Sequence, residues 1–159
     1  MAVDPREFRD AMGAFATGVA VITCAGPDGP AGLTTNAVSS VSLDPMLLLV
    51  CFDNTSRTLP AVRATGRFAV NVLREDQQEL AAVFASKRVA REKFELITHR
   101  IEHAVPVLDD ALAWLACDVD AWLPAGDHTI ALGAVTHVET GRPGRPLVFF
   151  GGAYGQLAG

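Results

Sequence analysis

Near the N-terminus, hydrophobic positions recur at the spacing of a helix. Asp4 suits a helix cap, Pro5 suits the first helical position, and Glu7 lies three residues after the cap. The pattern predicts an amphipathic helix that ends at Thr17-Gly18. The apolar face of this helix consists of Phe8, Ala11, Met12 and Phe15.

Most of the remaining chain alternates between short apolar runs and turn signals, which is typical of strands. Strands are expected at 19–24, 32–42, 46–52, 68–73, 112–122 and 129–140, with a short last one at 147–150. The run 46–52 is apolar throughout and predicts a strand buried on both faces. Turn clusters at 26–30 and 44–45 separate the first three strands.

Helices are expected between some of these strands. A polar loop at 54–58 opens a short helix that ends near Gly66, and 75–86 forms another, whereas the basic stretch 86–94 is expected to be irregular. Because most strands are adjacent in sequence and joined by short connections, antiparallel pairing is favoured. The sequence therefore predicts one domain, 1–159, that is mainly β: a six-stranded antiparallel Greek-key barrel with flanking helices.

Composition narrows the functional classes. The net charge is −5 and the 13 basic residues are scattered, which argues against a nucleic-acid partner. The charge-poor segment 11–25 is shorter than the ~20 residues of a spanning helix, so no membrane association is expected. Cys24, Cys51 and Cys117 form no CxxC pair, which predicts reduced thiols in a cytoplasmic protein.

Common catalytic and nucleotide-binding motifs are absent from the sequence. It contains no GxGxxG, GxxxxGK[ST], HExxH or GxSxG pattern. His99 and His103 have the i, i+4 spacing of a metal pair on a helix, but no third ligand accompanies them. We interpret them as a solvated pair and expect no metal site.

Three segments carry candidate chemistry. The first, Leu33–Pro45, places small hydroxyls and an amide on a strand, where they can meet a flat heteroaromatic ligand; a plain edge strand is the alternative. The second, Cys51–Thr58, joins hydroxyls, an arginine and a helix start, which suits a phosphate or else ordinary capping by Ser56. The third, Gly126-Asp-His128, places a histidine at the start of a strand. This histidine either contacts a ligand or has only a structural role.

In this order, the segments resemble the short-chain flavin reductase family, the reductase components of two-component flavin monooxygenases built on the FMN-binding split barrel. The resemblance covers nearly the whole chain, and Gly126-Asp-His128 is its sharpest element. Other matching pieces include Gly32-Leu-Thr-Thr-Asn-Ala37, Ser40-Val-Ser-Leu-Asp-Pro45, Ser56-Arg-Thr58, Gly66-Arg-Phe-Ala-Val-Asn-Val-Leu73, Phe84-Ala85, Lys93-Phe94 and Gly152-Ala-Tyr154.

The resemblance implies a homodimer that binds FAD or FMN near the subunit interface and takes hydride from NADH or NADPH. Reduced flavin would pass to a flavin-dependent monooxygenase. The cofactor performs the redox chemistry, so no catalytic dyad is required of the protein. No motif selects FAD over FMN, and the preference for NADH rests on the lack of an arginine cluster for a 2′-phosphate.

The resemblance also implies roles for individual residues. His128 matches a histidine near the nicotinamide, and Tyr154 matches an aromatic residue beside the same pocket. Many relatives carry Ala-Asn-Ser where this chain has Thr35-Asn36-Ala37, so the hydroxyl is displaced here. The flavin-binding residues expected on this basis are Thr34, Thr35, Asn36, Ala37, Cys51, Phe52, Ser56, Arg57, Thr58, Phe84, Ala85, Ser86, Lys87, Arg91 and Tyr154.

Two alternatives share the barrel architecture. A pyridoxamine-phosphate-type oxidase would need a cluster of basic residues for its substrate phosphate, and the sequence shows none. A non-catalytic flavin- or haem-binding module would retain its ligand tightly and show no turnover with NADH.

Overall fold

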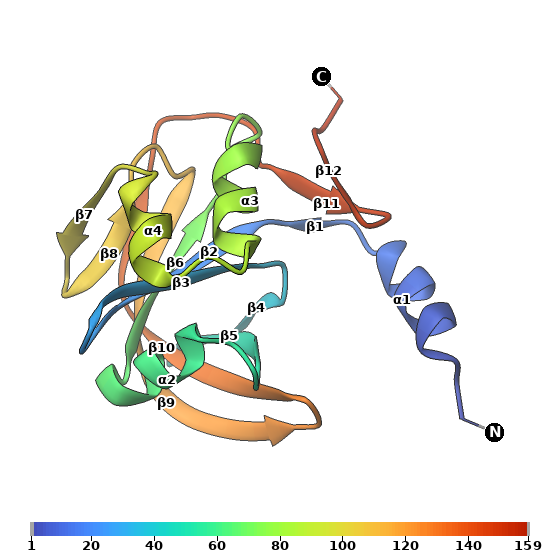
Figure 1. Cartoon of the computed structure of the whole chain (residues 1–159), viewed down its shortest axis with the longest axis horizontal. Coiled ribbons are helices and arrows are strands. Elements are labelled where there is room, and N and C mark those ends of the chain that lie inside the picture. The colour runs from blue at the N-terminus through green and yellow to red at the C-terminus, as the bar shows by residue number, and fades with distance from the viewer. Residues whose placement is uncertain (1, 159) are drawn as a thin grey trace.

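One seven-stranded antiparallel sheet carries most of the chain in a computed structural model, which describes residues 2–158 (Figure 1). Its strands lie in the order β3-β2-β6-β9-β10-β5-β4. Their bounds are Ala20–Gly26 for β2, Gly29–Thr35 for β3, Val38–Leu43 for β4, Met46–Asp53 for β5, Arg67–Val72 for β6, Ala113–Ala125 for β9 and His128–Thr140 for β10.

The two edges of this sheet meet, which makes it a barrel. β3 and β4 are opposite edges, yet only residues 36 and 37 separate them, a span of at most about 11 Å. The Cys51 backbone N–H donates to the Ala37 carbonyl at 3.0 Å, which continues the β4–β5 ladder into the link between the two edge strands. The mainly β antiparallel class predicted from the sequence is therefore confirmed.

The sequence prediction merged β3 and β4 into one strand, 32–42, and this was wrong. The Thr35 hydroxyl accepts the Ala37 N–H at 3.0 Å, and this local bond turns the chain out of the first ladder. The main sheet consequently has seven strands rather than six.

Strand β5 is buried on one face rather than on both. Leu48, Val50 and Phe52 are buried in the core, whereas Leu47, Leu49 and Cys51 on the other face are half-buried. The core covers only the inner face of the barrel, so an apolar run on β5 does not require burial on two sides.

The first helix, α1 (Pro5–Gly13), begins as predicted. The Asp4 carboxylate accepts the Arg6 N–H at 2.7 Å. No residue of α1 is buried, and Figure 1 shows the helix standing apart from the barrel. Phe8, Met12 and Phe15 of its apolar side are exposed.

The other helices flank the barrel. α2 (Thr58–Thr65) ends at Gly66, whose φ of 65° terminates it as predicted. α3 (Gln78–Ala85) begins later than predicted, because Arg74 and Gln77 exchange hydrogen bonds in a turn before it. α4 (Ala90–Glu95) lies within the stretch expected to be irregular, so that prediction was wrong. Within residues 2–158, no helix has both the length and the apolar character needed to cross a bilayer.

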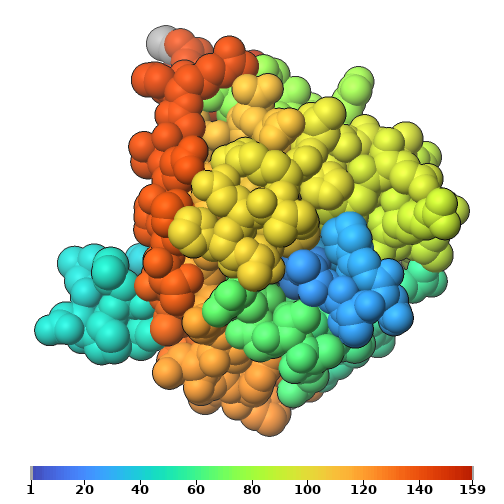
Figure 2. All heavy atoms as spheres, turned by 90° about the vertical axis from the view of Figure 1, so that its left-hand side faces the viewer, coloured from blue at the N-terminus to red at the C-terminus, as the bar shows by residue number. Residues whose placement is uncertain are grey.

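Short strands complete the fold. β7 (His99–Glu102) and β8 (Val105–Leu108) form a hairpin that the sequence analysis missed. β1 (Thr17–Gly18), β11 (Val148–Phe150) and β12 (Ala153–Gly155) form a small sheet near the C-terminus. Figure 2 shows the turn between β4 and β5, in cyan, protruding from the body of the molecule.

A buried polar residue holds the β7–β8 hairpin to the barrel. The Asn71 amide of β6 donates to the Val21 carbonyl and to the Thr23 hydroxyl, each at 3.1 Å, and its oxygen accepts the Leu108 N–H at 2.9 Å. Thr23 in turn donates to the Pro106 carbonyl. These bonds connect β2, β6 and β8 in a region with no access to solvent.

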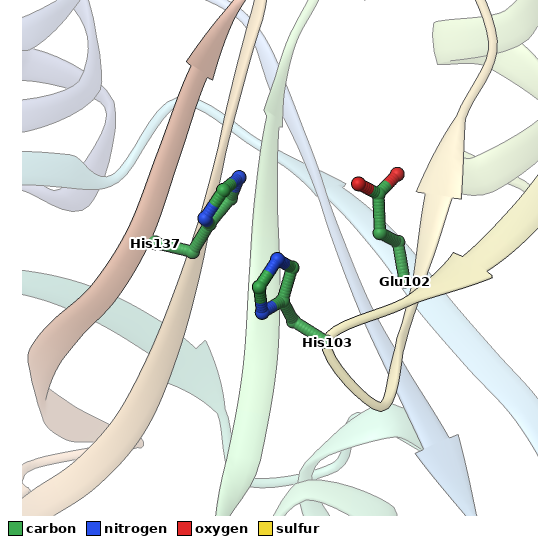
Figure 3. Close-up of side chains that lie close together, drawn as sticks. All are labelled: Glu102, His103 and His137. Carbon is green, nitrogen blue, oxygen red and sulfur yellow. The ribbon is translucent and has the colours of Figure 1, made fainter.

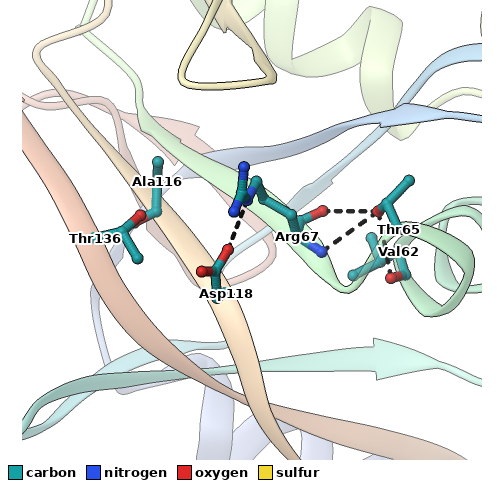
Figure 4. A network of polar contacts seen from close by, with 6 residues as sticks. All are labelled: Val62, Thr65, Arg67, Ala116, Asp118 and Thr136. Atoms are coloured by element: carbon teal, nitrogen blue, oxygen red, sulfur yellow. Dashed lines mark hydrogen bonds and ion pairs between the residues drawn. The ribbon is translucent and has the colours of Figure 1, made fainter.

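A second polar cluster ties the end of α2 to the sheet (Figure 4). The Thr65 hydroxyl contacts the backbone N–H and carbonyl of Arg67, and Arg67 Nε lies 2.6 Å from Asp118 Oδ1 on β9. Both charged side chains are partly exposed, so the ion pair contributes only about 0–1 kcal/mol to stability and serves mainly to orient the strands.

Gly133 on β10 is packed too closely to accept a side chain. A Cβ there would lie 2.8 Å from Phe68 Cζ and 3.0 Å from Cys117 Cβ. We expect Gly133→Ala to lower the free energy of unfolding by about 1–3 kcal/mol through overpacking. Urea denaturation measures this effect. Gly155→Ala, where a Cβ meets nothing within 4 Å, is the control and should change stability little.

Candidate functional site

A cavity of about 590 Å³ opens between β3, the end of β5 and the segment that follows α3. The N-terminus of α2 and the start of β10 complete its wall. The structure brings together these residues predicted from the sequence: Thr34, Thr35, Cys51, Ser56, Arg57, Thr58, Phe84, Ala85, Ser86, Lys87 and His128.

Five other predicted residues lie off this wall. The Phe52 side chain is fully buried in the core against Phe68, so any ligand contact would involve its backbone. Arg91 is largely exposed and pairs with Glu95 at 2.8 Å, outside the cavity. Tyr154 packs on Phe149 in the small C-terminal sheet.

Asn36 and Ala37 occupy the link between the two edge strands. Asn36 lines a smaller hollow of about 310 Å³ beside Phe15, and Ala37 is half-buried with its carbonyl bonded to Cys51. Neither residue reaches the large cavity within one protomer.

The hydroxyls of β3 are already engaged by the protein. Thr34 donates to the Ala81 carbonyl of α3 at 2.7 Å, and Thr35 accepts the Ala37 N–H. Because β3 is an edge strand, alternate backbone N–H groups are free of the ladder and can serve a ligand. The strand therefore offers a flat polar backbone with small side chains.

Gly32 keeps this wall thin. A Cβ at this position would lie 2.9 Å from both the Ile22 carbonyl oxygen and the edge of the Phe84 ring. The ring of Phe84 therefore packs directly on the β3 backbone.

One end of the cavity is cationic. Arg57, Lys87, Arg88 and Lys93 all line it. Lys93 is buried, and its ammonium donates to the Phe84 carbonyl at 3.0 Å. Burial, followed by repulsion from Arg57, lowers the pKa of Lys93. Such a group of donors favours a phosphate.

The start of α2 lies at the same end. The Ser56 Oγ accepts the Thr58 N–H at 3.1 Å just before the N-cap residue of α2, Arg57, and its hydroxyl proton can donate to a ligand. Lys93 and Arg88 were missed as site residues in the sequence analysis. The signal that could have found them is the basic stretch 86–94, which was read as irregular.

His128 stands at the mouth of the cavity. It lies opposite Asp53 across the β5–β10 ladder, and its Nδ1 is 2.7 Å from Asp127 Oδ1. The other ring nitrogen is left for a ligand. Hydrogen bonds from Thr55 lower the pKa of Asp53, with a smaller contribution from the charge of His128.

Asn54 fixes the loop that carries His128. Its backbone N–H donates to the Asp127 carbonyl at 3.0 Å, its amide donates to the Gly126 carbonyl at 3.3 Å, and its oxygen accepts the Thr129 hydroxyl at 2.7 Å. Gly126 adopts a φ of 65°, which favours glycine. The loop that carries the histidine is thus fixed by Asn54, the residue that follows β5.

The cysteines offer no thiolate at neutral pH. Burial raises the pKa of Cys51 in the cavity wall, and raises those of Cys24 and Cys117 in the core to about 11 and about 12. A cysteine nucleophile is thereby disfavoured. The arrangement suits binding and orientation of a ligand that carries its own chemistry.

The predicted solvated pair of His99 and His103 does not form, because the segment is a hairpin rather than a helix. His99 packs edge-on against Phe94 at 5.0 Å between centroids. His103 lies in the β7–β8 turn and stacks on His137 at 3.9 Å.

Comparisons with known proteins identify the family. The model of the flavin reductase like domain matches residues 12–158. A probable flavin reductase of Rhizobium meliloti is 44% identical over 138 residues, which are 86% of this chain and 44% of the relative. This chain thus spans less than half of that relative's length.

Two further relatives match over most of both chains. The reductase subunit HsaB of a flavin-dependent monooxygenase from Mycobacterium tuberculosis is 40% identical over 96% of this chain and 82% of its own length. The solved NADH:FAD oxidoreductase SgcE6 of Streptomyces globisporus, in complex with NAD and FAD fragments, has a TM-score of 0.91. It is 32% identical and covers 99% of this chain and 97% of that one.

Proposed function

The chain belongs to the flavin reductase-like domain family, and on that premise we propose that it transfers hydride from NADH to FAD or FMN. The observation that carries this proposal is the single cavity that combines the edge strand β3, a cationic end and His128 at its mouth. NADPH is the alternative donor. The similarity to a named NADH:FAD oxidoreductase supports both the flavin and NADH.

The residues of the cavity fit a flavin. Its volume of about 590 Å³ lies within the ~300–1,000 Å³ of small-molecule sites. The edge strand β3 offers backbone N–H groups to a planar ring, and the cationic end suits the phosphate attached to the ribityl chain. Bound flavin supplies the hydride acceptor.

The protein binds and orients the two reactants. Arg57, Lys87 and Lys93 hold the phosphate, and the β3 backbone supports the ring. His128 positions the nicotinamide so that the reacting atoms approach to about 3–3.5 Å. No protein group transfers a proton in this account, and burial raises the pKa of the Cys51 thiol in the wall.

Lys93 provides a test of the phosphate end. We expect Lys93→Met to weaken FMN binding about 10-fold at neutral pH, ~1.4 kcal/mol, because it removes a buried cationic donor. Since the pKa of Lys93 is lowered, its charge is lost at a lower pH than that of an exposed lysine. The affinity of the unsubstituted protein should therefore fall at alkaline pH and approach that of the variant.

Flavin fluorescence titration at several pH values measures this effect. Arg91→Met is the matched control, because Arg91 is exposed and lies outside the cavity. Equal losses in both variants, or no loss in Lys93→Met, would contradict the assignment.

The proposal includes a homodimer. Exposed apolar side chains gather on α1 and on the protruding β4–β5 hairpin of Figure 2, including Phe8, Met12, Leu43 and Met46. Leu43 is 91% exposed at the turn, which is unusual for a leucine without a partner. We propose that a second copy of this chain covers these apolar side chains, as the family resemblance implies.

Light scattering coupled to gel filtration tests this assembly. A dimer is expected, and Met12→Glu combined with Leu43→Glu should shift it to monomer while circular dichroism is unchanged. A monomer before substitution would refute the dimer.

We further propose that reduced flavin leaves for a partner monooxygenase in the cytoplasm. The similarity to a monooxygenase reductase subunit supports the partner, and the free thiols of Cys24, Cys51 and Cys117 support a reducing compartment. Flavin should then exchange freely, so gel filtration is expected to separate most of it from the protein.

Steady-state oxidation of NADH and NADPH with FMN and FAD, in all four pairings, tests the activity. We expect flavin-dependent oxidation that saturates with both reactants and is faster with NADH. Oxidation in no pairing would refute the proposal, and tightly retained flavin without turnover would favour the non-catalytic module.

A further inference from the structure

A group of metal-ligating side chains lies between the β7–β8 hairpin and β10, outside the cavity (Figure 3). Glu102 and His103 come from the hairpin and His137 comes from the sheet. One ligand atom of each lies within 4.8 Å of the others. We propose that these three residues bind a divalent transition-metal ion of the Zn²⁺ type, contrary to the expectation from the sequence.

The two imidazoles lie next to each other. His103 and His137 stack with centroids 3.9 Å apart and planes at 21°, and Trp114 lies 4.8 Å from His137. His103 occupies a turn position with a φ of 48°. Figure 3 shows the nitrogen-bearing rings and the Glu102 carboxylate grouped around one gap.

A buried nitrogen supports a ligand at this place. His137 Nε2 is shielded from solvent and has no hydrogen-bond partner among the described residues. Buried polar atoms of this kind are almost always paired, and a metal ion is a partner that neutral imidazole accepts readily. His137 Nε2 is therefore available to coordinate a metal ion.

The charges around the cluster favour a cation. Glu102 Oε2 accepts Arg100 Nε at 2.8 Å, which leaves the second carboxylate oxygen for a metal. Arg100 also faces Asp109 at 3.6 Å and Glu139 at 3.8 Å. One guanidinium therefore stands among three carboxylates, and the local charge is negative.

The donor set selects the class of metal. Two imidazoles and one carboxylate suit Zn²⁺ or Co²⁺, whereas Mg²⁺ and Ca²⁺ prefer oxygen donors alone. Ligand atoms around tetrahedral Zn²⁺ lie about 3.3 Å apart, so the exposed turn must close by roughly 1.5 Å. Because a metal lies in the plane of each imidazole that binds it, His103 must also turn its ring out of the stack on His137, and its exposed position allows this movement.

The site is remote from the proposed chemistry. His137 lies nine residues after His128 on the same strand, which corresponds to about 30 Å at the usual rise. A metal here would fasten the hairpin to the sheet rather than act on hydride transfer. The inference does not depend on the proposed function.

Titration of the tag-free, chelator-treated protein with Co²⁺ and Zn²⁺ tests the site. We expect one equivalent of Co²⁺ to give the intense visible absorption of four-coordinate cobalt, Zn²⁺ to displace it, and Zn²⁺ to raise the melting temperature. NADH-dependent flavin reduction should be the same with and without metal.

Single substitutions test which side chains coordinate the metal. His103→Asn retains the turn, because asparagine tolerates positive φ, and should weaken Co²⁺ binding at least 10-fold, as should Glu102→Gln. His99→Gln, on the same hairpin but outside the cluster, is the control and should bind normally. No cobalt spectrum, or equal binding by His103→Asn and His99→Gln, would overturn the proposal.

Discussion

His128→Ala is expected to lower kcat/KM for NADH about 100-fold, ~2.7 kcal/mol, because misplacement of a reactant by about 1 Å has effects of this size. The histidine stands at the mouth of the cavity, held by the Asp127 carboxylate and by the loop that Asn54 fixes. Its loss therefore removes orientation of the nicotinamide and leaves the phosphate end intact.

Comparing kcat/KM for NADH with the dissociation constant for FMN makes this prediction specific. The dissociation constant for FMN should change less than about threefold, since Lys93 and Arg57, which we assign to the phosphate, are unaltered. His99→Ala, at a histidine packed on Phe94 outside the cavity, should have normal kinetics. An unchanged kcat/KM in His128→Ala would remove this residue from the mechanism.

Asn71→Ala is expected to lower the free energy of unfolding by about 3–5 kcal/mol, because it leaves several buried polar groups without hydrogen-bond partners. The Leu108 N–H and the Val21 carbonyl would lose partners where no water enters. Loss of the side chain also removes the polar link between β6 and the β7–β8 hairpin. Equilibrium denaturation in urea measures the change.

An exposed asparagine is the matched control for stability. Asn36→Ala should change the free energy of unfolding by less than about 0.5 kcal/mol, as exposed sites usually do. A loss in Asn71→Ala no greater than that in Asn36→Ala would show that the buried network contributes little to the fold.

Local signals in the sequence were sufficient for several elements. The capping residues Asp4 and Pro5 located α1, and Gly66 located the end of α2. The two longest strands, β9 and β10, were expected because their length and alternation exceed those of any competing pattern. The cavity residues of the 51–58 and 84–87 segments were predicted because the motifs resemble, in the same order along the chain, those of the flavin reductase family.

Features that depend on tertiary packing were missed. The β7–β8 hairpin turns at His103 and Ala104, where positive φ occurs without the glycine or asparagine that usually signals it. The burial of Lys93 depends on how α4 packs near Phe84, which no spacing along the chain reveals. The meeting of His103 and His137 likewise depends on the hairpin folding over β10.

The boundary between the edge strands β3 and β4 was also mispredicted. A single polar run, 32–42, looked like one strand, but the Thr35 hydroxyl bends it and the halves pair with different neighbours. The barrel closes at this bend. A hydrogen bond between residues two apart accompanies this bend, and composition alone gives no sign of it.

Anaerobic mixing of the flavin-loaded protein with NADH tests the central claim most directly. If the cavity holds the flavin ring open to the nicotinamide, the visible flavin absorbance bleaches in a single turnover, and deuterium at the transferred C4 position of NADH slows the bleaching. Flavin that binds in the cavity yet keeps its absorbance with both NADH and NADPH would contradict the account.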